Sequence, residues 1–277
     1  LRFIALWLEW QMEIDVGAIL LFGAALVAGG INAVAGGGGL LVFPALLLSG
    51  ISPISANATS AAGIWIGMLV NNVAYRTELR PVMPRLGPVT LATLLGGAFG
   101  AWLLLNFSDD SFAFVVPYLV ALGTLLFAVA PRLAKFSRRP SRATSQTPLA
   151  EIVEAPAFNQ PALLLFQGII SIYGGFFGGG AGILMLTLLS LTNPGRLQTL
   201  QAVKVWLALC INAAALSYFV FADIIDWPYA ALVAGGTSVG GYSSVYFAKK
   251  VSTAWLRRFV IVSGVVLSCY FFIVTYS

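Results

Sequence analysis

The longest stretch of the chain without a charged residue decides most of what the chain can fold into. Residues 16–75 contain no Asp, Glu, Lys or Arg, and this length is enough for three helical crossings of a bilayer at about 20 residues each. Further charge-free stretches span residues 86–108, 111–131, 155–195, 205–222, 227–248 and 259–277. Only 9% of the 277 residues are charged, against about 25% in an average soluble domain. We therefore predict an integral membrane protein, and we exclude secreted disulfide scaffolds, nucleic-acid-binding domains and ordinary cytosolic enzymes.

Gly, Pro and Asn residues divide the charge-free stretches into about ten segments, which predict an all-α fold. Their expected spans are 15–35, 39–50, 55–75, 83–106, 112–130, 161–177, 181–193, 198–221, 228–247 and 255–275. The second and seventh segments are too short for a hydrocarbon core of about 30 Å, because a helix rises 1.5 Å per residue. They are expected to be half-helices or re-entrant segments.

An internal repeat divides these segments into two sets of five. Residues 36–49 read GGGGLLVFPALLLS and residues 179–192 read GGAGILMLTLLSLT, and pairs of glycines four apart recur at 96 and 100 and at 236 and 240. The chain is thus expected to have an N-terminal transmembrane repeat (1–131), a basic linker (132–160) and a C-terminal transmembrane repeat (161–277). Because Met12 is a natural start before the first helix, residues 1–11 are expected to be an upstream extension outside the fold.

The loop charges predict that the two repeats are inverted. By the positive-inside rule, the loop with Arg76, Arg80 and Arg85 and the basic linker are cytoplasmic, and the loop with Asp109 and Asp110 is outside. In the second half the acidic loop (223–226) precedes the basic loop (249–258), so equivalent loops carry opposite charge. Ten crossings of the cell membrane with both termini outside satisfy every loop. If the two short segments were re-entrant and only eight segments crossed, one cation-rich loop would lie outside, against the positive-inside rule.

The chain contains no histidine, which removes an imidazole base, a Ser-His-Asp triad and a histidine metal ligand. Cys210 and Cys269 lie in apolar runs, where cysteine usually behaves as a small buried hydrophobe. We therefore expect no enzyme, no metal site and no cofactor, and no nucleic-acid partner.

Interrupted helices in inverted repeats are a transporter design, in which the substrate binds where half-helix ends meet. Two facing helix N-termini suit a small anion, because each carries a partial positive charge. The candidate substrate-binding residues come from the two Gly-rich breaks and from the starts of the third and eighth segments. They are Gly36, Gly37, Gly38, Gly39, Asn57, Thr59, Ser60, Gly178, Gly179, Gly180, Gly182, Gln201 and Lys204.

Each candidate also has a structural interpretation. The glycines of the breaks serve either the site or close helix packing, and packing is favoured for the glycines at 63, 67, 96, 100, 236 and 240. Lys204 either binds an anion or snorkels to the headgroups, and Thr59 and Ser60 serve the site or cap their helix. The asparagines at 32, 71, 72 and 212 are expected to bond between helices. No carboxylate lies clearly within a span, so the anion is expected to move alone or to carry its own proton.

These motifs resemble the TauE/SafE family of sulfite exporters, small multi-pass permeases for sulfite and organosulfur anions. The resemblance covers residues 16–270 and rests on the first Gly-rich break leading to Pro44, on Ala56-Asn57-Ala58-Thr59-Ser60, on Tyr75-Arg76 and on the second break. It implies a secondary transporter that exports sulfite, or a related small sulfur-containing anion, by alternating access around a midplane site.

The second repeat departs from the pattern of that family. Thr187 stands where the first repeat has Pro44, and Ala202-Val203-Lys204 stand where Thr-Ser is expected. A permease for another small anion or an organosulfonate, importing or exporting, remains an alternative, as do a non-transporting membrane subunit and, least favoured, an intramembrane enzyme. The sequence leaves the oligomeric state open.

Overall fold

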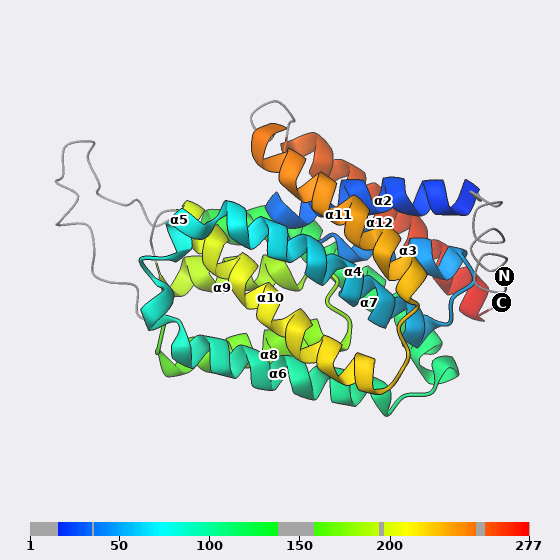
Figure 1. Ribbon diagram of the computed structural model, residues 1–277, viewed down its shortest axis with the longest axis horizontal. Coiled ribbons are helices and arrows are strands. Elements are labelled where there is room, and N and C mark those ends of the chain that lie inside the picture. Colours follow the sequence, from blue (N-terminus) through cyan, green and yellow to red (C-terminus); the bar gives the residue numbers. More distant parts are fainter. Residues whose placement is uncertain (1–15, 35, 138–157, 194–196, 248–252, 277) are drawn as a thin grey trace, which may run out of the picture.

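The computed structural model describes residues 16–34, 36–137, 158–193, 197–247 and 253–276, and every regular element in these ranges is helical. Figure 1 shows long helices that run along a common direction, with short helices between them. The first half contains α2 (Val16–Val34), α3 (Gly39–Leu48), α4 (Pro53–Ala74), α5 (Arg76–Leu79), η1 (Met83–Arg85), α6 (Gly87–Leu105) and α7 (Asp109–Ser137). The second half contains α8 (Pro161–Phe176), α9 (Ala181–Thr192), α10 (Leu197–Phe221), α11 (Trp227–Phe247) and α12 (Thr253–Tyr276).

The ten expected segments correspond to ten of these helices, with bounds that differ by at most four residues except at the end of α7, which lies seven residues later than expected. The differences have local causes. α4 begins at Pro53, because proline is favoured in the first helical turn, and α7 continues through Ser137 into the expected linker. The expected extension at residues 1–11 and residues 138–157 of the linker lie outside the described ranges.

Two of the helices are as short as expected. α3 has 10 residues and α9 has 12, so at 1.5 Å per residue each spans less than about 20 Å. Three described helices are long and apolar enough to cross a membrane by length and composition, namely Gly87–Leu105, Asp109–Val129 and Gln198–Phe221. This composition is consistent with a membrane protein, and the number of crossings stays a prediction.

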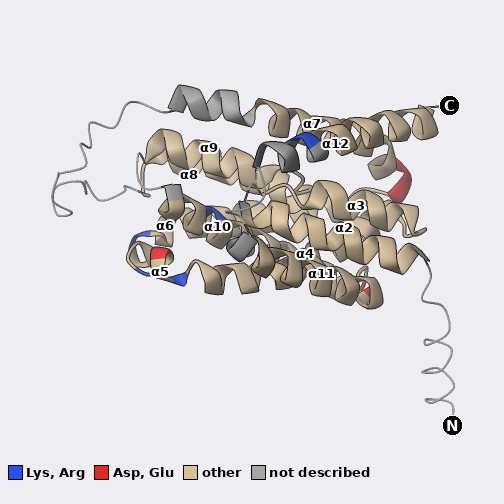
Figure 2. Cartoon of the chain, turned by 90° about the horizontal axis from the view of Figure 1, so that it is seen from above, with Lys and Arg blue, Asp and Glu red and all other residues tan. Residues whose placement is uncertain are grey.

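Three connections meet at one end of the helix bundle. At the start of α4, the backbone N–H of Ile54 donates to Oδ1 of Asp109, the first residue of α7, at 2.9 Å. Two further bonds join α4 to the connection between α10 and α11: Ser55 Oγ donates to the Ile224 oxygen at 2.6 Å, and the Asp226 N–H donates to Thr59 Oγ1 at 2.9 Å. Because α4 begins here and ends at Ala74, the basic segment α5–η1 lies at the opposite end. In Figure 2, α5 carries both basic and acidic residues at one end of the molecule, and the other acidic residues lie toward the opposite end.

Glycines let helices from opposite halves approach closely. A Cβ on Gly63 would lie 2.5 Å from the Val233 side chain, on Gly96 2.7 Å from Ser171 Cβ, and on Gly236 2.7 Å from Ala25 Cβ. Cβ atoms at Gly67, Gly100 and Gly240 would likewise overlap α11, α8 and α2. The packing role expected for these glycines is confirmed, and the halves share one core, in which α2 and α4 pack on α11 while α8 and α10 pack on α6.

The two Gly-rich breaks cross near the middle of the bundle. Gly36, Gly178 and Gly180 have φ values of +83°, +79° and +83°, which glycine adopts without steric cost. A Cβ on Gly36 would lie 2.8 Å from Gly182 Cα, and a Cβ on Gly182 would lie 2.8 Å from Gly36 Cα. The chain therefore needs glycine at both positions for the breaks to touch. As a result, the N-termini of α3 and α9 converge.

Candidate anion-binding site

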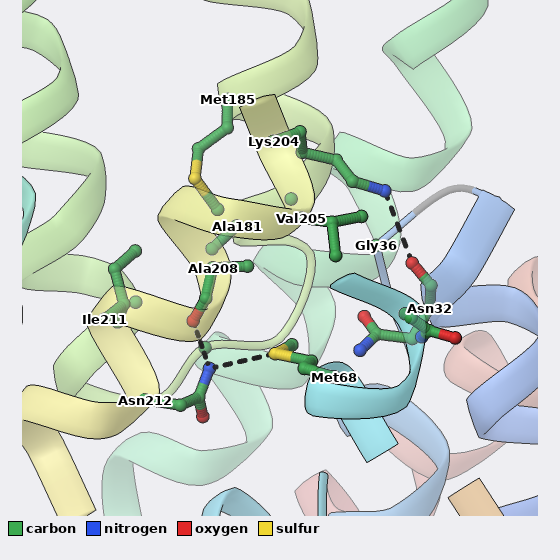
Figure 3. Close-up of a pocket in the computed structure, with 14 residues that line it drawn as sticks. Asn32, Gly36, Met68, Ala181, Met185, Lys204, Val205, Ala208, Ile211 and Asn212 are labelled. Carbon is green, nitrogen blue, oxygen red and sulfur yellow. Dashed lines mark hydrogen bonds between the residues drawn. The ribbon is translucent and has the colours of Figure 1, made fainter. Parts of the chain in front are cut away.

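A cavity of about 40 Å³ lies beside the crossing of the breaks. A water molecule needs roughly 10–15 Å³ of such space, so the cavity has room for a group of a few heavy atoms. Its walls come from α2, α4, the end of α8, the start of α9 and α10, with Gly36, Gly178 and Gly182 contributing backbone. Figure 3 shows these elements around it.

Lys204 on α10 supplies the positive charge of this cavity. Its side chain is only 1% exposed, and its ammonium donates to the main-chain oxygen of Asn32 at 3.3 Å (Figure 3). The ammonium therefore lies inside the fold and does not snorkel outward. An ammonium has three N–H donors, and among the described residues Lys204 makes one hydrogen bond, to Asn32.

Three asparagines add polar groups to the wall. Asn212 Nδ2 donates to the Ala208 oxygen at 2.9 Å and contacts Met68 Sδ at 3.7 Å (Figure 3). Asn71, 2% exposed, also lines the cavity, and its Oδ1 accepts no hydrogen bond from the described residues. Asn32 contributes its carbonyl oxygen to Lys204 and lines the same space. Amide groups can donate to an anion without adding charge.

Neutral contacts make up the rest of the lining. Among the lining residues, Met68 and Met185 come from α4 and α9, and Val205, Ala208 and Ile211 come from α10. Such a wall excludes water and lowers the local dielectric, which strengthens the attraction between an ammonium and an anion. One cation, several amides and an apolar wall are a chemistry suited to a small anion.

Four of the sequence-derived candidates line this cavity: Gly36, Gly178, Gly182 and Lys204. The others lie elsewhere. They are Gly37, Gly38, Gly39, Asn57, Thr59, Ser60, Gly179, Gly180 and Gln201. Among them, Gly38 packs on α2, where a Cβ would lie 2.5 Å from the Ala28 oxygen, so its smallness serves helix packing.

Two of the polar candidates make bonds between helices. Asn57 Nδ2 donates to the Phe176 oxygen at 2.9 Å and thereby ties α4 to the end of α8. Thr59 accepts the N–H of Asp226 just before α11. The capping interpretation of Thr59 and Ser60 is wrong for their own helix, because α4 begins at Pro53 and both residues lie inside it.

Sequence reasoning missed the polar and sulfur-bearing residues opposite Lys204. Asn32, Asn71 and Asn212 were expected to bond between helices, and Met68 was not singled out. The expected bonds between helices are present for Asn72, whose Nδ2 donates to the Val205 oxygen at 3.4 Å, and for Asn212, whose Nδ2 donates to Met68 Sδ at 3.7 Å. The available signal was an amide in the middle of a charge-free stretch, since buried polar groups in a membrane segment often mark a pathway.

Comparison with known proteins gives matches over most of the chain. The profile of the family described as Sulfite exporter TauE/SafE matches residues 21–271. "Probable membrane transporter protein ORF9" from Sinorhizobium sp. is 24% identical over 90% of this chain and 89% of its own length. A "Probable membrane transporter protein" from Haemophilus influenzae is 25% identical over 93% of this chain and 95% of its own. "Probable membrane transporter protein YfcA" from Escherichia coli is 30% identical over 59% of this chain and 55% of its own. No solved structure matches.

The apolar helices, the interrupted segments and these matches define a helical membrane transporter and not an enzyme. Within that class, the chain belongs to the TauE/SafE sulfite exporter family.

Proposed function

We propose that the protein carries a small anion across the cell membrane by binding it beside Lys204, in the cavity where the two breaks cross. The observation that carries the proposal is a buried lysine without a carboxylate partner among the described residues, at a cavity between interrupted helices. Isolated charges in a protein interior are costly, and charged residues within membrane segments often mark substrate pathways. An anion in the cavity would supply the missing counter-charge.

Helix packing supports the proposal that the two halves are inverted repeats. The five long or interrupted helices of the first half (α2, α3, α4, α6, α7) correspond in order to α8, α9, α10, α11 and α12. Under this correspondence the main contacts have counterparts: the pair α2–α11 corresponds to α8–α6, and the pair α3–α4 corresponds to α9–α10. The pairs α4–α10 and α7–α12 each map onto themselves. This is the pattern of a pseudo-twofold axis.

The helix directions agree with inversion. Gly96 and Gly100 on α6 face Ser171 and Ile172 on α8, so these two helices run in parallel from the basic end. Gly236 and Gly240 on α11 face α2 at Ala25 and Leu26, so that pair runs in parallel from the acidic end. The equivalent helices α2 and α8 therefore start at opposite ends of the bundle.

The proposed transport cycle follows from this arrangement. The site lies at the axis between the repeats, where related movements of the two halves can open it to either side in turn. The basic end, with Arg76, Arg80 and Arg85, is proposed to face the cytoplasm, and the acidic end and both termini the outside.

Sulfite is the substrate that we propose, with export as the direction, because the family is described as sulfite exporters. A cavity of about 40 Å³ favours an anion of a few heavy atoms over a large organic acid. Neither the lysine nor the amides distinguish sulfite from other small sulfur anions by charge alone.

The test is efflux of sulfite from vesicles that contain the purified protein, with thiosulfate, sulfate and methanesulfonate as competitors. We expect saturable efflux that is absent from protein-free vesicles. The degree to which each competitor inhibits sulfite efflux ranks the anions by apparent affinity. Absence of protein-dependent flux for all four anions would overturn the proposed function.

A further inference from the structure

Lys204 is surrounded by helices that offer it no ionisable partner. It lies on α10, which packs against α4, α6, α8 and α9 and against the short α5. The described parts of α6 and α9 contain no titratable residue at all, and α4 contains none between Pro53 and Ala74. Of the residues that line the cavity, Lys204 is the one that can gain or lose a proton at ordinary pH.

The remaining titratable groups on these elements are engaged elsewhere. On α8, the Tyr173 hydroxyl donates to the Gly179 oxygen at 2.5 Å. On α5, Glu78 accepts from Thr77 Oγ1 at 2.8 Å, and Arg76 is exposed. On α10 itself, Cys210 is buried and lies outside the cavity lining, and Tyr218 is exposed and also lies outside it. None of them supplies a counter-charge to the ammonium, whose recorded partner is the neutral oxygen of Asn32.

The described acids lie at the ends of the bundle. Asp109 and Asp110 begin α7, Asp223 and Asp226 lie between α10 and α11, and Glu78 lies on α5. Lys204 and Asp223 are 19 residues apart, most of them within α10, which corresponds to about 28 Å along a helix. Asp223 therefore lies too far along α10 to relay a proton to Lys204, and no carboxylate of the described residues lines the cavity.

On this geometry we propose that Lys204 couples the transport of the anion to a proton: the amine binds a proton together with the anion and releases it when the anion leaves. The inference rests on the proposed function, since it needs an anion that binds at the cavity. It adds a coupling ion and the group that carries it.

The energetic reason is the cost of an isolated charge in the protein interior. Without an anion, the ammonium can release its proton to water on whichever side the cavity opens. With an anion, a proton from that water occupies the amine lone pair, and the ammonium and a monovalent anion together are neutral. Anion binding and proton binding then favour each other by the same free energy, as linkage requires. A neutral complex also crosses the low-dielectric interior at the least electrostatic cost.

The first test measures anion flux and proton flux together in vesicles. Sulfite, thiosulfate and methanesulfonate serve as probes, and the last two stay deprotonated around neutral pH. We expect a pH gradient to drive the transported probe up its own gradient in the native protein, with one proton per monovalent anion. The Lys204→Arg variant carries a permanent charge, so any flux that it retains should not follow the pH gradient.

The second test needs only binding and therefore does not depend on whether a variant transports. Isothermal titration of the purified native protein with the transported probe, in buffers of different ionisation enthalpy, counts the protons taken up with the anion. Uptake that approaches one proton per anion as pH rises, with the dissociation constant increasing about tenfold per pH unit in that range, is expected.

The possible results separate the two proposals. Flux of a probe with no proton uptake at any pH, or an equal response of the native protein and Lys204→Arg to the pH gradient, would overturn the coupling and leave the transport function standing. In the second case the proton would travel on the substrate. Absence of flux and binding for every probe would overturn the function itself, and the coupling with it.

Discussion

The ammonium of Lys204 donates to the main-chain oxygen of Asn32 across 3.3 Å, although the two residues are 172 positions apart in the sequence. This bond joins the second half of the chain to the end of α2, just before the first break. Free carbonyl groups at a helix C-terminus carry partial negative charge, so the carbonyl is a weak neutral substitute for an anion. A bound anion would accept from the Lys204 ammonium in place of the Asn32 carbonyl or together with it. Anion binding would thereby change a contact next to the first break.

The contact between the two breaks predicts different effects for matched glycine variants. Gly182→Ala places a methyl 2.8 Å from Gly36 Cα, whereas Gly39→Ala, at the equivalent place in the first repeat, meets nothing closer than 3.9 Å. Overpacking costs about 1–3 kcal/mol, and about 1.4 kcal/mol is a factor of ten. Sulfite flux in vesicles should fall about tenfold or more in Gly182→Ala and stay near the native value in Gly39→Ala. Equal fluxes in the two variants would contradict the crossing of the breaks as part of the site.

The bond from Asp226 to Thr59 predicts a loss of stability without a loss of affinity. Thr59→Val keeps the shape of the side chain but removes the acceptor of the Asp226 N–H. A buried donor without an acceptor costs about 1–3 kcal/mol, and the lower end of that range applies because Asp226 is half-buried. Thermal unfolding of the purified variant should begin several degrees lower, while half-saturation for sulfite is unchanged. Thr77→Val, at an exposed position, is the control and should alter neither. A weaker apparent affinity for sulfite in Thr59→Val would contradict this prediction and would indicate that Thr59 contributes to anion binding.

The proposed orientation predicts opposite labelling at the two ends of the bundle. In a chain with Cys210 and Cys269 replaced by alanine, Asp110→Cys and Arg85→Cys each provide one exposed thiol. A membrane-impermeant maleimide added to intact cells should label Asp110→Cys, and it should label Arg85→Cys only after the membrane is permeabilised. Labelling of both thiols in intact cells would contradict the orientation.

The helix pattern was readable from the sequence because charges are rare within the long helices and gather near their ends and between them. The predicted segment 181–193 and the observed Ala181–Thr192 differ by one residue. The predicted helix ends were wrong where a charged residue or a proline, expected to lie outside a helix, lies within its first or last turns. The sequence of α7 contains Arg132 and Lys135, so the segment was cut too early, although a helix end tolerates cations well.

Only part of the candidate site was readable in the same way. Lys204 stood out as a charge away from the loops, and Gly182 stood out because its break recurs. Asn71 and Asn212 could not be assigned to the cavity, since their place depends on which helix faces meet across halves of the chain. Thr59 lies in a family-like motif, yet its bond to Asp226 depends on a connection 167 residues away.

The most direct test of the central claim is sulfite efflux from vesicles that contain the native protein, Lys204→Met or Arg85→Met. An isolated buried charge is costly, and an apolar side chain of similar length removes that cost, so Lys204→Met is expected to fold and to unfold thermally near or above the native midpoint. Arg85 is exposed and serves as the matched removal of a cation. The account predicts that saturable efflux falls to the level of protein-free vesicles in Lys204→Met and persists in Arg85→Met. Native efflux and half-saturation in a folded Lys204→Met would contradict the claim that the anion binds beside Lys204.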